Sequence, residues 1–360
     1  MTRAADRVRS IDWSALDGLD LREPIARILE NQPAERVLDR FLRAHRDFTA
    51  AQRKVTAEAL FGIGLWRRRL ARQGGDPLHA LTHLGPDPDD FADRHSLPDW
   101  LAAELQRTPD PEALADALNL PGPITLRARD DRDRLAAELK QQGIETRPGA
   151  LAPNALIVTS DRPNLYGLDR SDFEVQDEGS QCLGELVQAK PGMTVLDLCA
   201  GAGGKTLQLA SKGATVHATD VDLERLERLR RRAERAGATN VLIHQNDPPA
   251  ADAVLVDAPC SELGALRRGP DLRWRLDPAT FEKLPALQLA LLEKAARLAT
   301  KRIVYATCTF RREENEDVCD RFERSTSAWR RTTVFRCWPH VEGTDAFFAC
   351  VYEPHPKNAA

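Results

Sequence analysis

Two cysteines and an aspartate stand at the ends of apolar stretches in the second half of the chain. Cys260 ends "DAVLVDAPC", with Asp257 three residues before it, and Cys308 ends "RIVYATC". A thiolate that adds to C6 of a cytosine makes C5 nucleophilic enough to attack an electrophilic methyl group. A nearby carboxylic acid can stabilise that adduct, and a second acid or base can help when the C5 proton leaves. The three residue types therefore suit covalent chemistry on a pyrimidine.

The other cysteines are interpreted mainly as small buried apolar residues. The chain has seven in all, the spacing is irregular and no C-x-x-C pair occurs, so neither a zinc site nor a disulfide framework is expected. The four that end no comparable strand are Cys182, Cys319, Cys337 and Cys350.

A glycine-rich turn, "CAGAGGKT", runs from Cys199 to Thr206 after the apolar stretch "TVLDL". Such a turn between a strand and a helix lets a ligand approach the backbone and the positive helix N-terminus. Cys199 stands where a phosphate-binding P-loop has its first glycine, and the G-x-G-x-x-G spacing of a dinucleotide site is absent. S-adenosylmethionine, which has no phosphates, needs only close backbone approach.

Asp220 ends the next predicted strand, about twenty residues after the turn. A carboxylate there accepts hydrogen bonds from the hydroxyls of a ribose. NAD and S-adenosylmethionine carry such a ribose, whereas ATP in a P-loop is not held this way, so the P-loop is disfavoured. Asp220 could instead cap the following helix, but Asp222 suits that role better.

Strands and helices alternate from about residue 170 onward, and the strands are apolar. This pattern predicts an α/β fold with a doubly wound, mostly parallel sheet covered on both faces. Ligands of such sheets bind beyond the carboxyl ends of the strands. We therefore expect the glycine-rich turn and both cysteine-bearing strand ends to converge at one edge.

The earlier part of the chain divides into three segments. Residues 1–75 read as an all-α domain, with a capping box at Thr49 and Gln52 and a double glycine as the final stop. Residues 76–97, rich in Pro, Asp and Gly, read as a linker. A small α+β unit is expected at 98–168, followed by the main domain at 169–355.

The composition is that of a globular protein, with 42% hydrophobic and 29% charged residues. No apolar stretch approaches the length of a membrane span, and the start lacks the apolar core of a signal peptide. A cytoplasmic protein is expected, with no membrane, metal or obligate protein partner. The net charge of −4 argues against coating nucleic acid by bulk charge but leaves room for a local basic groove.

One basic stretch, "RRGPDLRWR", follows the Cys260 segment directly. Arginine beside an aromatic ring can grip phosphate and stack on a base. The alternative is a solvated loop with Trp274 packed into the core. The candidate RNA-binding residues are Arg267, Arg268, Arg273 and Trp274.

Four stretches in order resemble the RNA 5-methylcytosine methyltransferases of the Nol1/Nop2/Sun family: "VQDEGSQ", "VLDLCAGAGGKT", "VDAPCSELGALRRGPDLRW" and "YATCTF". The resemblance covers about 170–355 and implies a Rossmann-like class I methyltransferase with a seven-stranded sheet. It implies that Cys308 is the nucleophile, that Cys260 assists release, and that Asp257 contacts the cytosine beside the cofactor. The residues that it assigns to S-adenosylmethionine are Cys199, Ala200, Gly201, Ala202, Gly203, Gly204, Lys205, Asp220, Asp247 and Asp257.

The N-terminal helices resemble, in shortened form, the NusB-like RNA-binding domain of bacterial small-subunit rRNA cytosine methyltransferases, with "FGIGLWRRRLARQ" as the best match. This points to 16S rRNA as the partner. The alternatives are tRNA or another RNA, a ribosome-assembly protein with weakened catalysis, or an NAD-dependent oxidoreductase. The sequence departs from the family at Gly201–Ala202, where "AP" is usual, and at Glu262, where a small residue is usual. The 247–257 span is also shorter.

Overall fold

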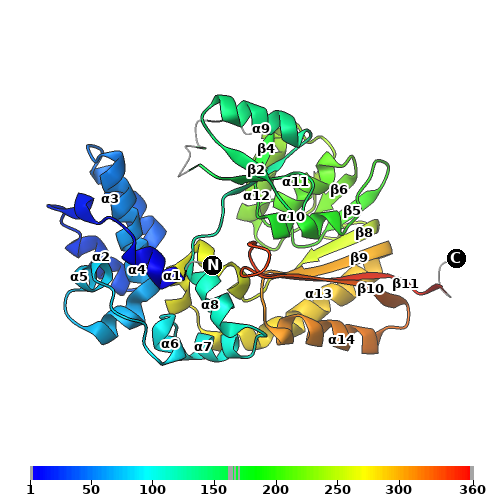
Figure 1. Cartoon of the computed structure of the whole chain (residues 1–360). Coiled ribbons are helices and arrows are strands. Elements are labelled where there is room, and N and C mark those ends of the chain that lie inside the picture. Colours follow the sequence, from blue (N-terminus) through cyan, green and yellow to red (C-terminus); the bar gives the residue numbers. More distant parts are fainter. Residues whose placement is uncertain (1–2, 161–164, 166–167, 169–170, 357–360) are drawn as a thin grey trace. The chain divides into compact units, whose positions relative to one another are not determined.

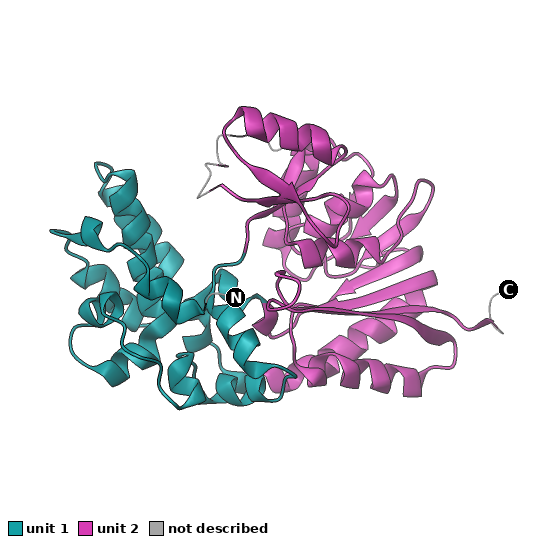
Figure 2. Cartoon of the chain, viewed as in Figure 1, with its two compact units in different colours: residues 1–122, 265–279 teal, residues 123–264, 280–360 magenta. Residues whose placement is uncertain are grey.

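The computed structural model describes residues 3–160, 165, 168 and 171–356. The chain forms two compact units, one of residues 1–122 and 265–279 and the other of residues 123–264 and 280–360 (Figure 2). The chain thus leaves the second unit after Gly264 and returns to it at Thr280. None of the helices that the structure describes is both long and apolar enough to cross a membrane.

The described part of unit 2 contains a seven-stranded sheet in the order β10-β11-β9-β8-β5-β6-β7 (Figure 1). Strands β9, β8, β5, β6 and β7 run parallel, and β11 and β10 are antiparallel additions. The predicted doubly wound, mostly parallel fold is confirmed. The strands are β5 (Thr194–Asp197), β6 (Thr215–Ala218), β7 (Val241–Ile243), β8 (Ala251–Asp257), β9 (Ala299–Thr307), β10 (Trp329–Cys337) and β11 (Phe347–Pro354).

Alternate residues of each central strand point to opposite faces of this sheet, as a period of two requires. Val254 and Val256 of β8 belong to one apolar cluster, and Ala253 and Leu255 to the other. Helices α13 and α14 pack on the first face, and α10 and α11 on the second (Figure 1). The helices of this unit are α9 (Arg132–Gln141), α10 (Glu178–Glu185), α11 (Gly204–Ser211), α12 (Leu223–Arg235), α13 (Leu284–Leu298) and α14 (Glu316–Ser325), with 3₁₀ turns η4 (Pro278–Lys283) and η5 (Arg312–Glu314).

The strand order reverses beside β5, since the chain goes from β5 to β6 and β7 and then crosses to β8 and β9. A sheet of this kind opens a crevice at the carboxyl ends of its strands where the order reverses. The glycine-rich turn follows β5, Asp257 ends β8 and Cys308 follows β9. The fold therefore brings these segments to one edge, as predicted.

A second, antiparallel sheet with the order β2-β3-β1-β4 precedes this one in unit 2. It buries Leu126, Leu156 and Phe173 against Leu135 and Leu139 of α9. Its strands are β1 (Thr125–Ala128), β2 (Thr146–Pro148), β3 (Ala155–Val158) and β4 (Phe173–Val175).

Unit 1 is helical and is built around α4, whose buried face includes Leu60, Ile63 and Trp66. The predicted capping box at Thr49 and Gln52 starts this helix. The unit contains α1 (Ala4–Arg9), η1 (Ser14–Leu16), α2 (Arg22–Leu29), α3 (Ala34–Ala44), α4 (Ala50–Gln73), α5 (Pro77–Thr82), α6 (Phe91–Arg94), α7 (Asp99–Gln106), α8 (Pro111–Asn119) and η3 (Pro270–Trp274); η2 (Leu263–Arg268) leads into it.

This division differs from the predicted segments. The 76–97 stretch carries α5 and α6, and α7 and α8 belong with the N-terminal helices rather than with the small sheet. Aspartates inside the Pro- and Asp-rich stretch act as helix N-caps, since Asp76 and Asp90 each accept a backbone N–H. The predicted boundary at 168–169 lies partly outside the described residues.

Candidate active site

The thiols of Cys260 and Cys308 face each other at the carboxyl edge of the sheet, with 3.4 Å between the two Sγ atoms. Each side chain is half-buried. Strands β8 and β9 are paired in parallel, with Asp257 opposite Ala306, so their following loops lie side by side. The structure thus brings together the two cysteines that the sequence singled out, and all cysteines of the chain are free thiols.

Asp257 forms an ion pair with Lys205, whose Nζ lies 2.7 Å from Asp257 Oδ2. The lysine side chain is 11% exposed and the aspartate 31%, so the pair is shielded but reachable. Burial opposes the charge on Lys205, yet the attraction of Asp257 and its hydrogen bond outweigh burial and raise the lysine pKa. The sequence assigned Lys205 to the cofactor alone and missed this contact with the other catalytic candidate.

Thr206, the next residue of the glycine-rich turn, is hydrogen-bonded to a second aspartate. The hydroxyl of Thr206 donates to Asp197 Oδ2 at 2.7 Å, and both side chains are buried. Burial raises the pKa of Asp197 to about 7, partly offset by this hydrogen bond. A P-loop needs its lysine and hydroxyl free for phosphate and Mg²⁺. Since both are committed to aspartates, the geometry argues against a nucleoside triphosphate site.

The glycine-rich turn leaves its backbone open to a ligand at two positions. A Cβ added at Gly201 or Gly204 would meet no atom within 4 Å, and helix α11 begins without a side-chain cap. Gly203 has a different role, because its φ of +90° is left-handed and an added Cβ would lie 2.1 Å from Leu229 Cδ1. An open backbone and uncapped N–H groups fit a ligand such as S-adenosylmethionine.

Asp222 caps the helix that follows β6, whereas Asp220 contacts the glycine-rich turn. Asp222 accepts the N–H groups of Glu224 and Arg225 and is the N-cap of α12, as predicted. Asp220 Oδ2 accepts the N–H of Gly201 at 2.8 Å, so the aspartate supports the glycine-rich turn itself. Asp247 is exposed after β7 with a left-handed φ of +41°. Ribose or cofactor binding by Asp220 and Asp247 stays a prediction.

The environment of Cys308 keeps its thiol protonated at rest. The hydrogen bond with Cys260, then burial, then the negative charges of Asp257 and Glu262 raise its pKa well above the usual value. Positive charge is also close, because Lys205 interacts electrostatically with Cys308. The thiolate fraction, and with it any rate that depends on the thiolate, is therefore sensitive to the charges around this thiol.

Cys199 contrasts with this pair. Burial and the nearby carboxylates of Asp197, Asp257 and Asp220 raise the pKa of its thiol, and its position is in the glycine-rich turn. The pKa of Cys308 is raised too, so position separates them: Cys199 belongs to the glycine-rich turn, whereas Cys308 faces Cys260 at 3.4 Å. Cys199 thus suits a place in the loop wall rather than in covalent chemistry.

Glu262 is the residue at which the sequence departs from the small residue usual in the family. It is exposed, lies two residues after Cys260 and has a left-handed φ of +58°. That conformation costs a residue other than glycine about 1–2 kcal/mol. Its carboxylate also contributes to the raised pKa of Cys308.

Replacing Glu262 with glutamine is expected to shift the pH dependence of alkylation of the Cys308 thiol toward lower pH. Loss of the negative charge lowers the pKa of Cys308, so more thiolate is present at any pH below it. We expect the rate of Cys308 alkylation at pH 7 to rise by about threefold at low salt and less at high salt, because the carboxylate is exposed. Glu262→Gly removes the same charge and also the energetic cost of the left-handed backbone conformation at this position. A profile for Glu262→Gln that overlays the wild type would contradict the electrostatic role.

The basic stretch after Cys260 lies in unit 1 and is largely committed to packing there. Arg273 is fully buried, and its guanidinium donates to Asn119 Oδ1 at 2.7 Å and to Leu118 O. The indole N–H of half-buried Trp274 donates to Gly64 O at 2.7 Å. The expected RNA contact of Arg273 is therefore corrected, because the side chain offers no surface and anchors the segment instead. For Arg267, Arg268 and Trp274, RNA contact stays a prediction.

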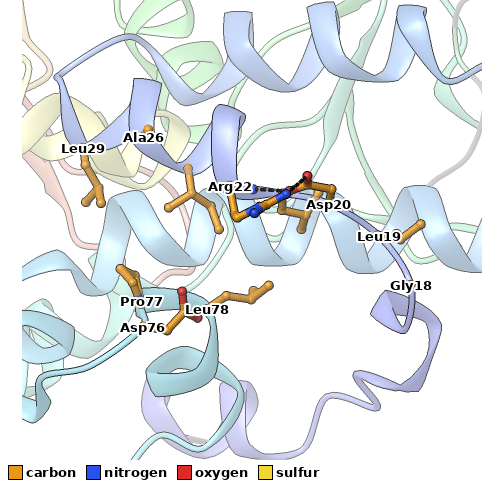
Figure 3. Close-up of a pocket in the computed structure, with 11 residues that line it drawn as sticks. Gly18, Leu19, Asp20, Arg22, Ala26, Leu29, Asp76, Pro77 and Leu78 are labelled. Carbon is orange, nitrogen blue, oxygen red and sulfur yellow. Dashed lines mark hydrogen bonds and ion pairs between the residues drawn. The ribbon is translucent and has the colours of Figure 1, made fainter.

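A pocket of about 610 Å³ lies in unit 1, between the start of α2 and the start of α5 (Figure 3). Its lining comes from residues 18–29 and 76–78 and is mainly apolar, with the Asp20–Arg22 ion pair at its side. None of the predicted site residues lines it. Across the described residues, no group of three or more His, Cys, Asp or Glu side chains is placed to hold a metal ion.

Residues 185–353 match the family described as 16S rRNA methyltransferase RsmB/F. The probable ribosomal RNA small subunit methyltransferase B of Bacillus subtilis is 30% identical over 323 residues, which cover 79% of this chain and 71% of that protein. This chain belongs to the RsmB/F family. The family expected from the ordered motifs is thereby confirmed.

Two further relatives of this RsmB/F chain are similar over less of their length. The probable small subunit methyltransferase B of Synechocystis is 33% identical over 67% of this chain and 59% of its own. The Thermus thermophilus methyltransferase B is 32% identical over 71% of this chain and 62% of its own. The chain thus spans less than two thirds of these two relatives.

Solved structures agree on the fold. The crystal structure of PH0851 superposes with a TM-score of 0.80 at 22% identity, over 96% of this chain and 99% of that one. NSun6 from Pyrococcus horikoshii, solved with SFG, gives 0.65 at 18% identity, over 72% and 98%. The Rossmann-like methyltransferase fold is confirmed for this RsmB/F member.

Proposed function

We propose that the protein transfers a methyl group from S-adenosylmethionine to C5 of a cytosine in RNA, with 16S rRNA as the substrate. The observation that carries the proposal is the 3.4 Å apposition of the Cys260 and Cys308 thiols beside the Lys205–Asp257 ion pair. Membership of a family of 16S rRNA methyltransferases supports the choice of reaction and of RNA.

The cofactor residues of this proposal are the turn at 199–205 together with Asp220, Asp247 and Asp257. The open backbone at Gly201 and Gly204 and the uncapped start of α11 support it. When bound, S-adenosylmethionine supplies an electrophilic methyl group. The chain's own contribution is to hold the donor at the carboxyl edge, next to the thiols.

Cys308 acts as the nucleophile. Its thiolate forms a bond from Sγ to C6 of the cytosine, which makes C5 nucleophilic toward the methyl group that the bound donor would supply. The Asp257 carboxyl group hydrogen-bonds the base and stabilises the adduct, while Lys205 orients Asp257 and favours the thiolate through its positive charge. Lys205 thereby acts on the substrate side as well as in the turn.

Release requires that the C5 proton leave. As the C5–H bond breaks, its electrons form the C5–C6 double bond, and the C6–Sγ bond breaks to return the thiolate of Cys308. Cys260, whose Sγ lies 3.4 Å from that of Cys308, is placed to assist this elimination as an acid or base.

RNA binding is assigned to the NusB-like helices of unit 1 together with Arg267, Arg268 and Trp274. The segment that carries these three residues continues directly from the Cys260 loop. The cytosine must leave its stack to reach a thiol at a sheet edge, so single-stranded or partly folded RNA suits the site. The same chemistry on tRNA or another RNA is the alternative substrate class.

Bisulfite sequencing of RNA from cells with and without this protein tests the substrate. We expect a cytosine of 16S rRNA to resist conversion when the protein is present and to convert when the protein is absent. The protein restored with the Glu262→Gln change serves as an active control. If 16S rRNA converts identically in both cells, the rRNA assignment is wrong, and protection confined to tRNA would favour the alternative.

A further inference from the structure

The residues directly after Cys260 and Cys308 carry buried hydroxyl groups, and these two hydroxyl groups are hydrogen-bonded to each other. Ser261 Oγ and Thr309 Oγ1 lie 2.8 Å apart, with the residues 4% and 1% exposed. Ser261 Oγ donates its proton to Glu314 Oε1 at 2.5 Å. Because a serine hydroxyl has one proton, the Thr309 hydroxyl must donate to Ser261. A directed chain from Thr309 through Ser261 to Glu314 therefore joins the neighbours of both thiols.

Glu314 also holds the Cys260 segment by its backbone. Its Oε2 accepts the N–H of Ser261 at 2.9 Å and Nε2 of Gln288 at 3.0 Å. The same Gln288 amide donates to Pro259 O at 2.9 Å. The residues on both sides of Cys260 are thus fixed to one fully buried carboxylate, either directly or through one amide.

The Cys308 segment is fixed by the next residue along, Asn315. Thr307 Oγ1 donates to Asn315 Oδ1 at 2.6 Å, and Asn315 Nδ2 donates to Thr309 O at 2.9 Å. Tyr305 donates its hydroxyl to the Glu314 carbonyl at 2.6 Å. Glu314 and Asn315 therefore hold the residues on both sides of each thiol through hydrogen bonds, in one case through the Gln288 amide.

A buried carboxylate is costly to desolvate and is retained only where hydrogen bonds compensate it. Glu314 is fully buried, accepts hydrogen bonds from the loop after β8 and forms an ion pair with Arg311, whose Nη1 lies 3.5 Å from Glu314 Oε1. No proposed catalytic step uses it. We propose that Glu314 is a positioning residue that sets the apposition of Cys260 and Cys308. The effect of Glu314 on catalysis rests on the function proposed above, whereas its effect on the distance between the two thiols does not.

The test compares Glu314→Gln with the wild type and with Asp317→Asn, a control three residues on whose carboxylate pairs with Arg312 instead. The amide keeps the volume but accepts at only one of its two ends, so either the Ser261 hydroxyl or both the Ser261 N–H and the Gln288 amide lose their acceptor. The first readout is disulfide formation between Cys260 and Cys308 with diamide, which takes up the two electrons and two protons that the thiols lose. We expect this oxidation to slow by about fivefold or more in Glu314→Gln and to stay unchanged in Asp317→Asn.

The second readout is methyl transfer. We expect kcat to fall by about 10²-fold with the KM values for RNA and donor within about twofold of the wild type, because small misplacements of reacting groups carry penalties of that size. Ser261→Ala, which removes one hydroxyl and keeps the carboxylate, should give the same pattern with a smaller loss. It keeps the test valid if Glu314→Gln does not fold.

Folded variants that oxidise at the wild-type rate and keep the wild-type kcat would overturn the positioning role. The oxidation needs neither RNA nor donor. If the wild type makes no 5-methylcytidine while Glu314→Gln still slows the disulfide, the proposed function fails and the positioning role stands.

Discussion

Cys308→Ser is expected to abolish methyl transfer to RNA, with a fall in kcat of at least about 10³-fold. A serine hydroxyl at this position is far less nucleophilic than a thiolate, so the bond to C6 does not form. Binding should persist, because the RNA and donor contacts proposed here lie on other residues. Rapid-quench measurement of labelled methyl transfer at saturating RNA and donor checks the loss, and RNA affinity is measured separately.

Cys182→Ser is the matched control for this experiment. Cys182 is buried in α10, where it packs with Ala152, Ala155 and Phe335 and not with either of the two facing thiols. The control should keep wild-type turnover. If Cys308→Ser retained turnover within about tenfold of the wild type, Cys308 would not be the nucleophile.

Cys260→Ala is expected to trap the protein on its substrate rather than to block attack. The Cys308–C6 bond can still form and methyl transfer can still follow, but elimination loses the thiol placed 3.4 Å from Cys308. We expect a denaturation-resistant protein–RNA complex to accumulate and steady-state turnover to fall by about 10²-fold or more, the usual contribution of a positioned acid or base. Gel electrophoresis after denaturation measures the complex.

The double variant Cys260→Ala with Cys308→Ser is the control, and it should form no complex, since the trapped bond is to Cys308. Free turnover of Cys260→Ala at the wild-type rate would remove Cys260 from the release step. A complex that persists in the double variant would place the covalent bond on another residue.

Periodicity and strand-end chemistry were sufficient to predict the sheet and its active edge. The strand segments 195–197, 253–256 and 303–307 are buried on both faces, so their continuous apolar character was clear in the sequence. Strand β10 (Trp329–Cys337) was not predicted, because it is an edge strand with several exposed residues and a run of arginine and threonine. Such a strand lacks the apolar alternation on which the prediction depends.

The misjudged side chains are charged residues whose partners are distant in sequence. Arg273 pairs with Asn119, 154 residues away, and is buried, whereas its charge alone indicated the surface. Lys205 reaches Asp257, and Glu314 reaches Ser261, from separate elements. "REENED" reads only as a charged helix start, so nothing local identifies Glu314 as a buried acceptor. Burial of a charge depends on tertiary partners that composition does not contain.

The identity of the residue that binds the base tests the covalent account most directly. Wild-type protein is incubated with donor and with RNA that carries 5-azacytidine, where C5 is replaced by nitrogen and the adduct cannot lose a proton. The trapped complex is digested with nuclease and trypsin and sequenced by mass spectrometry. We predict the nucleotide on the thiol of Cys308, within tryptic peptide 303–311. A nucleotide on Cys260, or methylated RNA with no covalent adduct, would contradict the account.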